Sequence, residues 1–356
     1  MEYSIAIVGL DSEDFIDELI LDINQFKDKI KLNSISDQDE TKLLQYQKKL
    51  NIKKLYTDFK DHILTESPDI LIISFKPENV LKIILYAVEQ NIKGIILNRP
   101  ISSSMETTQR IVDLCKLNNI NLIINYKKRW DPLYLNIKNI IKTRYLGDLI
   151  SITGNMGIFS AKKGNYQNLI DTYGGGELLY GGSDLIDIIR MLAGEVVSIN
   201  GFIKRASPDY GTETSAYGML NMNSNTVVHL NVSALSKYDV FQIDLMFSKG
   251  RIIAGKNIKK CYALIDNADL GTYNELIKTD FPQTIEADKY NSGAISEMIY
   301  SLENRSYPVS SGFNALKSIE IAYGIYYSAY LSGNTISLPL KIAGNPLKKM
   351  FLSDML

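Results

Sequence analysis

Hydrophobic residues in the first 125 positions follow two alternating patterns. Short strand-like runs are separated by longer stretches in which apolar side chains recur every three or four positions, as on one face of a helix. The strand-like runs occupy residues 4–8, 30–36, 69–74, 94–97 and 121–124. The helix-like stretches occupy residues 15–26, 80–90 and 105–118, and a more polar helix ends at residue 50. This alternation predicts an α/β fold with a doubly wound parallel sheet over residues 1–125.

The pattern changes after residue 126. The expected segments are a helix at 133–143, a strand at 149–159, a glycine cluster with a helix at 174–193, repeated strands at 196–264 and a long helix at 314–331. The strands show period-two alternation. They predict a second domain, residues 126–356, of α+β class with an open-faced, mostly antiparallel sheet. Whether the C-terminal segment packs back on the first domain stays open.

The bulk composition excludes several classes of protein. A chain of 356 residues fits two domains better than one core, and its 45% hydrophobic and 22% charged residues are ordinary for a folded protein. A net charge of -1 gives no reason to expect nucleic acid or an anionic membrane as a partner. No apolar run reaches the roughly 18 residues that a membrane span needs.

Cysteine and histidine usage narrows the picture further. Cys115 and Cys261 sit in separate apolar stretches and are expected to be buried free thiols, which suits the reducing cytoplasm. The first residues lack the basic start of a signal peptide. His62 and His229 have no partners at metal-ligand spacing, so no metal site is expected.

The first strand-to-helix turn, residues 9–14, is where a dinucleotide fingerprint would lie. It keeps Gly9 but carries Asp11 and Asp14 at the positions of the second and third glycines. Asp37 closes the second strand, where it either holds an adenosine ribose or is an ordinary loop residue. Ser74 closes the third strand.

Further landmarks occur in a specific order. They are Asn98-Arg99-Pro100 after the fourth strand, Arg129-Trp130-Asp131-Pro132 after the fifth, the run Gly174-Gly175-Gly176 with Tyr180, Asp184 and Asp187 behind it, Gly194, Pro308-Val309-Ser310 and Leu338-Pro339. In this order and spacing the chain resembles the Gfo/Idh/MocA family of NAD(P)-dependent sugar oxidoreductases. The resemblance covers nearly the whole chain.

The resemblance implies a Rossmann-type domain for NAD or NADP and a sheet domain that contacts a sugar or nucleotide-linked sugar, as in surface-glycan biosynthesis. It implies cofactor contacts at Gly9, Asp11, Asp37, Ser74 and Pro100, and substrate contacts at Arg129, Trp130 and Tyr173. Trp130 is either a stacking face for a sugar ring or a packing residue. A homodimer or homotetramer is implied, or a hetero-oligomer with an active relative. Strand 227–235, with apolar residues on both faces, points to an interface on the sheet.

The chain departs from the family at the reaction residues. Arg99 replaces a lysine, Tyr180 an aspartate and Asp184 a histidine. An arginine holds an anion or polarises a carbonyl but does not donate a proton. Tyr180 is either the proton donor or a packing residue, and Asp184 is either a base or the ion-pair partner of Arg99. Tyr180 and Asp184 are four apart on one expected helix, so we expect them to share a face and to converge with Arg99 in one cleft.

The acids in the first turn oppose a bound pyrophosphate. Two unit charges about 4 Å apart repel by roughly 4 kcal/mol at an effective dielectric near 20, or about a thousandfold in affinity. Either these acids replace the phosphate and stabilise an empty pocket, or the loop binds the dinucleotide in another pose. Two functions therefore stay open: an active sugar oxidoreductase, and a non-catalytic homologue that binds a sugar or serves as a partner subunit without using NAD(P).

Overall fold

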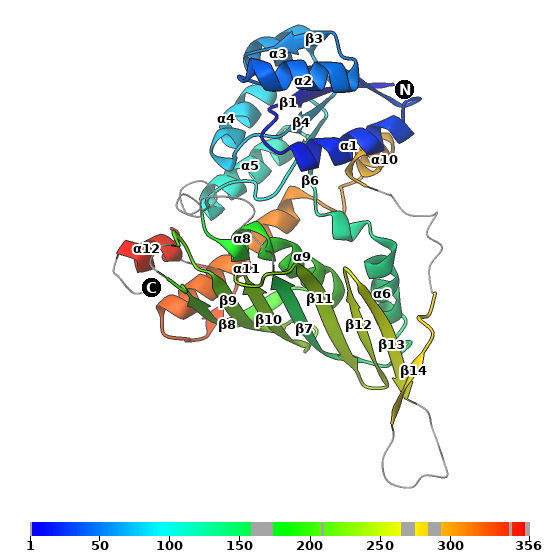
Figure 1. Cartoon of the computed structure of the whole chain (residues 1–356), viewed down its shortest axis with the longest axis vertical. Coiled ribbons are helices and arrows are strands. Elements are labelled where there is room, and N and C mark those ends of the chain that lie inside the picture. Colours follow the sequence, from blue (N-terminus) through cyan, green and yellow to red (C-terminus); the bar gives the residue numbers. More distant parts are fainter. Residues whose placement is uncertain are drawn as a thin grey trace. The chain divides into compact units, whose positions relative to one another are not determined.

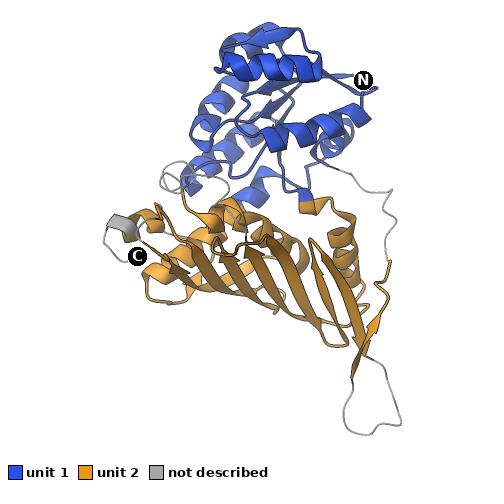
Figure 2. Ribbon diagram, viewed as in Figure 1, with its two compact units in different colours: residues 1–127, 291–316 blue, residues 128–290, 317–356 orange. Residues whose placement is uncertain are grey.

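The computed structural model describes residues 2–157, 174–207, 210–264, 275–283, 293–341 and 344–352. The chain divides into two compact units (Figure 2). Unit 1 comprises residues 1–127 and 291–316, and unit 2 comprises residues 128–290 and 317–356. Each unit has its own sheet.

Unit 1 contains a six-stranded sheet in the order β3-β2-β1-β4-β5-β6, and every strand pair in it is parallel (Figure 1). The strands are β1 Tyr3–Val8, β2 Ile30–Ser36, β3 Lys54–Tyr56, β4 Ile70–Ile73, β5 Gly94–Leu97 and β6 Asn121–Ile124. The helices are α1 Glu13–Gln25, α2 Glu40–Leu50, α3 Phe59–Glu66, α4 Pro77–Ala87, α5 Met105–Leu117 and α10 Ala294–Asn304. The predicted doubly wound parallel sheet is confirmed.

One strand and one helix of unit 1 escaped the sequence pattern. The sequence indicated five strands, whereas the described part of unit 1 has six, because β3 and α3 follow α2. β3 has only three residues and lies at the sheet edge, so it offers no run of buried positions to recognise. The start of α3 is marked by Asp58, whose carboxylate accepts hydrogen bonds from the backbone N–H groups of Lys60 and Asp61.

The core of unit 1 explains why its central strands are continuously apolar. β4 and β5 are buried at all four of their positions, because helices cover both faces of the sheet. The helices contribute amphipathic faces to this core. In α4 the buried residues Val80, Ile83, Ile84 and Ala87 recur at helical spacing.

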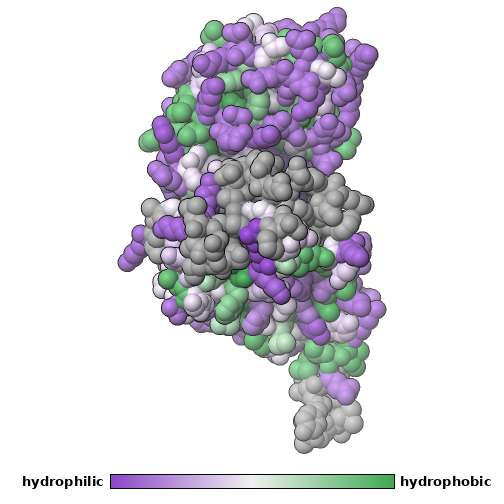
Figure 3. Space-filling view, turned by 60° about the vertical axis from the view of Figure 1, so that its left-hand side comes forward, coloured by the Kyte–Doolittle hydropathy of each residue, from purple (hydrophilic) through white to green (hydrophobic). Residues whose placement is uncertain are grey.

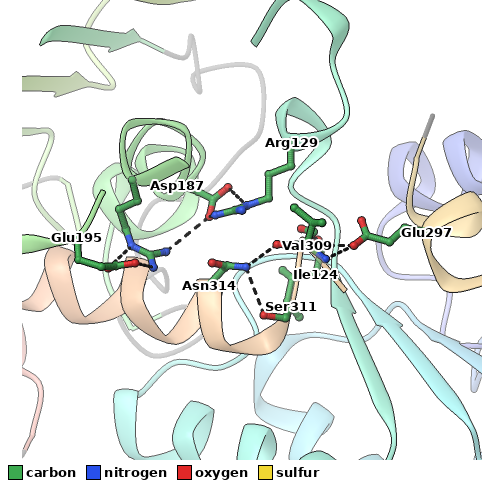
Figure 4. Close-up of polar contacts among 10 residues, drawn as sticks. Ile124, Arg129, Asp187, Glu195, Glu297, Val309, Ser311 and Asn314 are labelled. Atoms are coloured by element: carbon green, nitrogen blue, oxygen red, sulfur yellow. Dashed lines mark hydrogen bonds and ion pairs between the residues drawn. The ribbon is translucent and has the colours of Figure 1, made fainter. Parts of the chain in front are cut away.

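A late segment of the chain completes unit 1. Ser310 pairs with Ile124 at the end of β6: the Ile124 N–H donates to the Ser310 carbonyl at 2.8 Å, and the Ser310 hydroxyl donates to the Ile124 carbonyl at 2.5 Å. The buried carboxylate of Glu297, on α10, accepts the backbone N–H groups of Val309 and Ser310 (Figure 4). These bonds fix residues 309–310 against the last strand of the parallel sheet.

Unit 2 contains a nine-stranded sheet in the order β14-β13-β12-β11-β7-β10-β9-β8-β15. Only the β7–β10 pair is parallel among the described pairs, so the sheet is mostly antiparallel, as predicted. The strands are β7 Leu149–Gly157, β8 Val196–Lys204, β9 Ser215–Met222, β10 Val227–Ser233, β11 Val240–Phe247, β12 Gly250–Gly255, β13 Ile258–Leu264, β14 Leu276–Thr279 and β15 Ile336–Ser337. Other elements are η1 Lys127–Arg129, α6 Pro132–Lys142, α8 Glu177–Tyr180, α9 Gly182–Ala193, α11 Gly312–Tyr330 and α12 Pro346–Leu352.

Helices cover one face of the second sheet. Leu185 and Ile189 of α9 lie against Gly154 of β7, and Ile325 of α11 lies against Gly201 of β8. The strands alternate accordingly, with Val228, Leu230 and Val232 of β10 buried on the helical face.

The opposite face carries exposed side chains of the described strands. β10 presents His229 and Asn231 on this face, in phase with the half-buried Val227, so the strand carries polar and apolar residues there. On β8 and β9, Phe202, Tyr217 and Met219 are 59%, 42% and 41% exposed. They line a hollow of about 410 Å³.

No helix among the described residues has the length and apolar character needed to cross a bilayer. The described residues also contain no group of three histidine, cysteine or acidic side chains arranged around a metal position. On the face of unit 1 seen in Figure 3, hydrophilic side chains predominate.

His62 is a neutral histidine sealed inside unit 1. Its Nδ1 and Nε2 atoms lie 2.8 Å and 2.7 Å from the hydroxyls of Ser36 and Ser34, and its ring stacks on Tyr56 at 4.7 Å. Burial lowers the pKa of His62 to about 4. As the pH falls, His62 therefore becomes protonated in the unfolded chain at a higher pH than in the folded chain.

Unfolding experiments across pH test this assignment. We expect His62 to remove roughly 3 kcal/mol of stability as the pH falls from about 6.5 to 4, since stability is lost below the unfolded pKa. Asp22, whose pKa burial raises to about 6, titrates over the same range with opposite sign. The measurement is therefore the difference in unfolding free energy between the wild type and His62→Gln. A difference that does not change with pH would contradict the assignment.

Candidate functional site

The turn between β1 and α1 is built on Gly9. Gly9 has a φ of +86°, and a Cβ there would lie 2.5 Å from the Phe75 ring, so glycine is required by the protein's own packing. Its N–H donates to the Ser36 carbonyl. Ser12 is the N-cap residue of α1, and its side chain makes no capping hydrogen bond to the helix.

The Asp11 carboxylate is engaged with the chain itself. One oxygen accepts the backbone N–H of Lys76 at 3.1 Å, and the other lies 3.5 Å from the ammonium of Lys42. Glu13 and Asp14 follow as exposed acids in the first turn of α1. Three carboxylates therefore cluster where the fold would present an anion-binding helix start.

Asp37 is turned into the unit. Only 6% of it is exposed, and its two oxygens accept the backbone N–H groups of Leu10 at 2.6 Å and Asp39 at 2.8 Å. Asp37 thus ties the first turn to the end of β2. Each oxygen retains acceptor capacity for a further donor.

Two other strand ends are joined to the same turn. The Ser74 hydroxyl accepts the N–H of Ser12 at 3.1 Å, and the Ser74 carbonyl accepts that of Asp11 at 2.9 Å. The amide of Asn98 donates to the Ser12 hydroxyl at 3.3 Å, and its oxygen accepts the N–H of Arg99. The Arg99–Pro100 peptide bond is cis. The carboxyl ends of β1, β4 and β5 thus meet, where open α/β sheets bind ligands.

The turn has the features of a dinucleotide-binding fold. Gly9, the uncapped start of α1 and the position of Asp37 match the requirements for pyrophosphate and ribose. That Asp11, Glu13 and Asp14 lower the affinity for a pyrophosphate at this turn stays a prediction. The acids that the sequence places at this turn are thus exposed there in the folded unit.

In unit 2, the predicted helix behind the glycine run is two helices. α8 ends at Tyr180, and α9 begins at Gly182, with Gly181 between them. The expectation that Tyr180 and Asp184 lie on one helix is therefore wrong. Glycine has poor helix propensity, and Gly181 and Gly182 fall at this junction. Tyr180 is half-buried, whereas Asp184 is 7% exposed.

Asp184 has a partner that sequence reasoning missed. The Lys128 ammonium lies 3.3 Å from the Asp184 carboxylate and 4.0 Å from the centroid of the Phe241 ring. Only 27% of the Lys128 side chain and 9% of the Asp184 side chain are exposed. In the sequence, the only indication that Lys128 belongs to the site is its position directly before Arg129 and Trp130.

Arg129 is held by Asp187. Its Nε and Nη2 atoms donate to the two oxygens of Asp187 at 2.7 Å and 2.8 Å, and both side chains are buried. Arg190 lies 3.8 Å from Asp187 and forms a second fork on Glu195 (Figure 4). The Arg129 fork thus anchors the start of unit 2 to α9.

The remaining candidates have separate outcomes. Trp130 is 6% exposed and belongs to the buried core, between η1 and α6. Its stacking role, like the substrate role of Arg129, stays a prediction. Tyr173 lies outside the described residues. Arg99 belongs to unit 1 while Tyr180 and Asp184 belong to unit 2, and their convergence also stays a prediction.

The Arg129–Asp187 pair generates a stability prediction. Arg129→Met should lower the unfolding free energy by about 3–5 kcal/mol, because it leaves Asp187 as a buried charge that has lost its bidentate partner. Arg129→Met with Asp187→Leu should recover most of the loss, since an apolar pair replaces an ionic one at little cost. Urea unfolding measures both. Equal stability of the wild type and the single variant would contradict this role.

Comparisons with known proteins agree with this architecture. Residues 3–126 match the family model described as oxidoreductase family, NAD-binding Rossmann fold, and residues 134–253 match that of the GFO/IDH/MocA C-terminal domain. The D-xylose 1-dehydrogenase [NADP(+)] of Haloarcula marismortui is 26% identical over 101 residues, 28% of each chain. The chain spans between 28% and 54% of the length of such curated relatives.

Solved structures share the fold over almost the whole chain. The WlbA dehydrogenase from Bordetella pertussis, in complex with NADH and UDP-GlcNAcA, superposes with a TM-score of 0.78 at 18% identity and covers 96% of this chain and 100% of its own. A levoglucosan dehydrogenase in complex with NADH and levoglucosan gives 0.81 at 14% identity, with the same coverage. At these identities the likeness establishes the fold. The two family models together span most of the chain, and this protein belongs to the Gfo/Idh/MocA oxidoreductase family.

Proposed function

We propose that this protein is an NAD(P)-dependent oxidoreductase that acts on a sugar or a nucleotide-linked sugar. The observation that carries the proposal is the Lys128–Asp184 pair, in which a buried acid at the start of α9 meets a largely buried cation of η1. The family resemblance implies that the residue at position 184 handles a proton or orients the substrate. The ligands of WlbA and levoglucosan dehydrogenase support the substrate class.

The residues of the chain receive distinct roles in this proposal. Arg99 holds an anionic group or polarises the carbonyl of the substrate, because its guanidinium stays charged at working pH. Tyr180 donates or accepts the proton at the reacting oxygen, and Asp184 orients it. Arg129, Trp130 and Tyr173 are the proposed substrate contacts.

The cofactor would be held at the carboxyl ends of the first sheet. Gly9, Asp11, Asp37, Ser74 and Pro100 are the residues proposed to surround it. When bound, the nicotinamide supplies or accepts the hydride. Asp11, Glu13 and Asp14, in the turn between β1 and α1, lower the affinity for the cofactor. Weak dinucleotide binding is therefore part of the proposal.

A second function is favoured by the contacts of Asp11. Its carboxylate already receives the Lys76 N–H and the Lys42 charge, contacts that a phosphate oxygen would otherwise take. A homologue that binds a sugar, or partners an active relative, without using NAD(P) would retain such an internal substitute.

Titration calorimetry with NADH and NADPH tests the electrostatic penalty. We expect dissociation constants above the micromolar range for both. Asp11→Gly combined with Asp14→Gly should tighten binding tenfold or more, because a single close charge pair accounts for up to about a thousandfold. Asp17→Asn, which removes an acid one turn further along α1, is the matched control and should change binding little. Micromolar binding by the wild type would sink the prediction.

Kinetics with UDP-GlcNAcA and levoglucosan as first probes separate the two functions. In an enzyme, Tyr180→Phe should abolish turnover and leave ligand affinity within a few-fold. In a binding protein, Arg99→Ala should be the damaging change, by about 1.5–3 kcal/mol for a lost charged hydrogen bond. Tyr300→Phe alters an exposed tyrosine of α10 and serves as the control. Full turnover by Tyr180→Phe would refute its assigned role.

We also propose a homodimer or larger assembly formed through the open face of the second sheet. Light scattering should give a mass that is a multiple of 40.1 kDa. Phe202→Ser with Tyr217→Ser should shift the protein toward monomer by removing apolar area from the face. Tyr145→Ser, at a tyrosine that is 60% exposed outside the sheet, should not. A wild type that is monomeric across micromolar concentrations would contradict the proposal.

A further inference from the structure

The glycine run before α8 closes around a carboxylate of the protein itself. Glu213 lies two residues before β9 and is 1% exposed. Its oxygens accept four donors: the N–H of Gly176 at 3.0 Å, the N–H of Leu178 at 3.3 Å, the Thr212 hydroxyl at 2.5 Å and the Tyr326 hydroxyl at 2.7 Å.

Two of the glycines are required by this approach. A Cβ on Gly176 would lie 2.7 Å from a carboxylate oxygen of Glu213 and 2.6 Å from a methyl carbon of Thr212. A Cβ on Gly175 would lie 2.7 Å from the Tyr326 hydroxyl. All three distances are shorter than real Cβ contacts allow. The residues at 175 and 176 are therefore glycine because the backbone must reach Glu213 and Tyr326.

Glu213 is held by dipoles rather than by a cation. None of its contacts with the described residues is an ion pair, and its donors come from the backbone, Thr212 and Tyr326 on α11. Burial raises the pKa of Glu213, which these donors oppose. Removing one partner from such a buried group is costly, so the geometry of its donors is tightly fixed.

Backbone hydrogen bonds connect the segment that Glu213 binds, residues 176–178, to Tyr180 and Asp184. The Tyr180 N–H donates to the Gly176 carbonyl at 3.0 Å, and the Gly181 N–H donates to the Glu177 carbonyl at 2.9 Å. The Asp184 N–H in turn donates to the Gly181 carbonyl at 3.1 Å. Tyr180 is thus one backbone hydrogen bond from Gly176, and Asp184 is two from Glu177, the residue between the two amides that Glu213 binds.

We propose that Glu213 is the positioning residue for Tyr180 and Asp184. It fixes the start of α8 through the amides of Gly176 and Leu178 and thereby sets the orientation of the α8–α9 junction. The kinetic consequence rests on the proposed oxidoreductase function, whereas the structural consequence does not. The test therefore measures both.

The central variant is Glu213→Gln, which keeps the shape and replaces one acceptor oxygen with a donor. Amide hydrogen exchange should rise about tenfold or more at Gly176 and Leu178 and extend to residues 180–184, as expected for a lost charged hydrogen bond. In an active enzyme, kcat should fall about tenfold with KM within threefold. Tyr326→Phe, which removes a single donor, should give a smaller change of the same kind if Glu213→Gln fails to fold.

Glu297→Gln is the matched control. Glu297 is equally buried and also accepts two backbone N–H groups, but in unit 1. It should lower the melting temperature without raising exchange in α8. The proposal is overturned if Glu213→Gln or Tyr326→Phe leaves exchange at residues 176–184 unchanged, or lowers kcat no more than Glu297→Gln does at equal stability. If the wild type turns over neither UDP-GlcNAcA nor levoglucosan with NAD(P)(H), the functional proposal fails for these probes, and exchange alone decides the role of Glu213.

Discussion

The buried carboxylate of Asp187 imposes the strongest constraint on the second unit. A carboxylate with 1% side-chain exposure needs partners of fixed geometry, and for Asp187 the cations Arg129 and Arg190 supply them. Because Arg129 directly follows Lys128 in the chain, fixing one places the other. Two consecutive cations then meet two acids, Asp184 and Asp187, that lie three residues apart on α9. The Arg129–Asp187 ion pair thus also positions the Lys128–Asp184 pair on which the proposed function rests.

In the first unit, contacts within the chain stabilise the turn between β1 and α1, where relatives are expected to bind a ligand. Gly9 is needed by Phe75, Asp37 receives the Leu10 N–H, and Ser74 joins two strand ends. A turn stabilised in this way does not depend on a cofactor to stay folded. Its sequence can drift from the fingerprint while the parallel sheet, whose strands are buried on both faces, remains unchanged. This explains how family membership coexists with altered motifs.

The sequence allowed the long-range architecture to be predicted better than the site. Strong apolar runs such as β4 and β5 identified the parallel sheet, whereas β3, with three residues at an edge, left no periodic signal. The split between α8 and α9 depends on Gly181, which a spacing argument treats as one more helical position. Lys128 is one of 39 lysines and arginines, and nothing in its local pattern separates it from a solvated surface lysine. Its contacts with Phe241 and Asp184, over a hundred and over fifty residues away, arise only from the tertiary fold.

The position of Trp130 has a spectroscopic consequence. It is the only tryptophan in the chain, and it lies buried in the second unit. Intrinsic tryptophan fluorescence therefore reports on the surroundings of this one residue of unit 2, while far-ultraviolet circular dichroism sums over both units. Transitions that coincide by the two probes would mean that the units unfold as one cooperative system, and transitions that separate would give each unit its own melting curve.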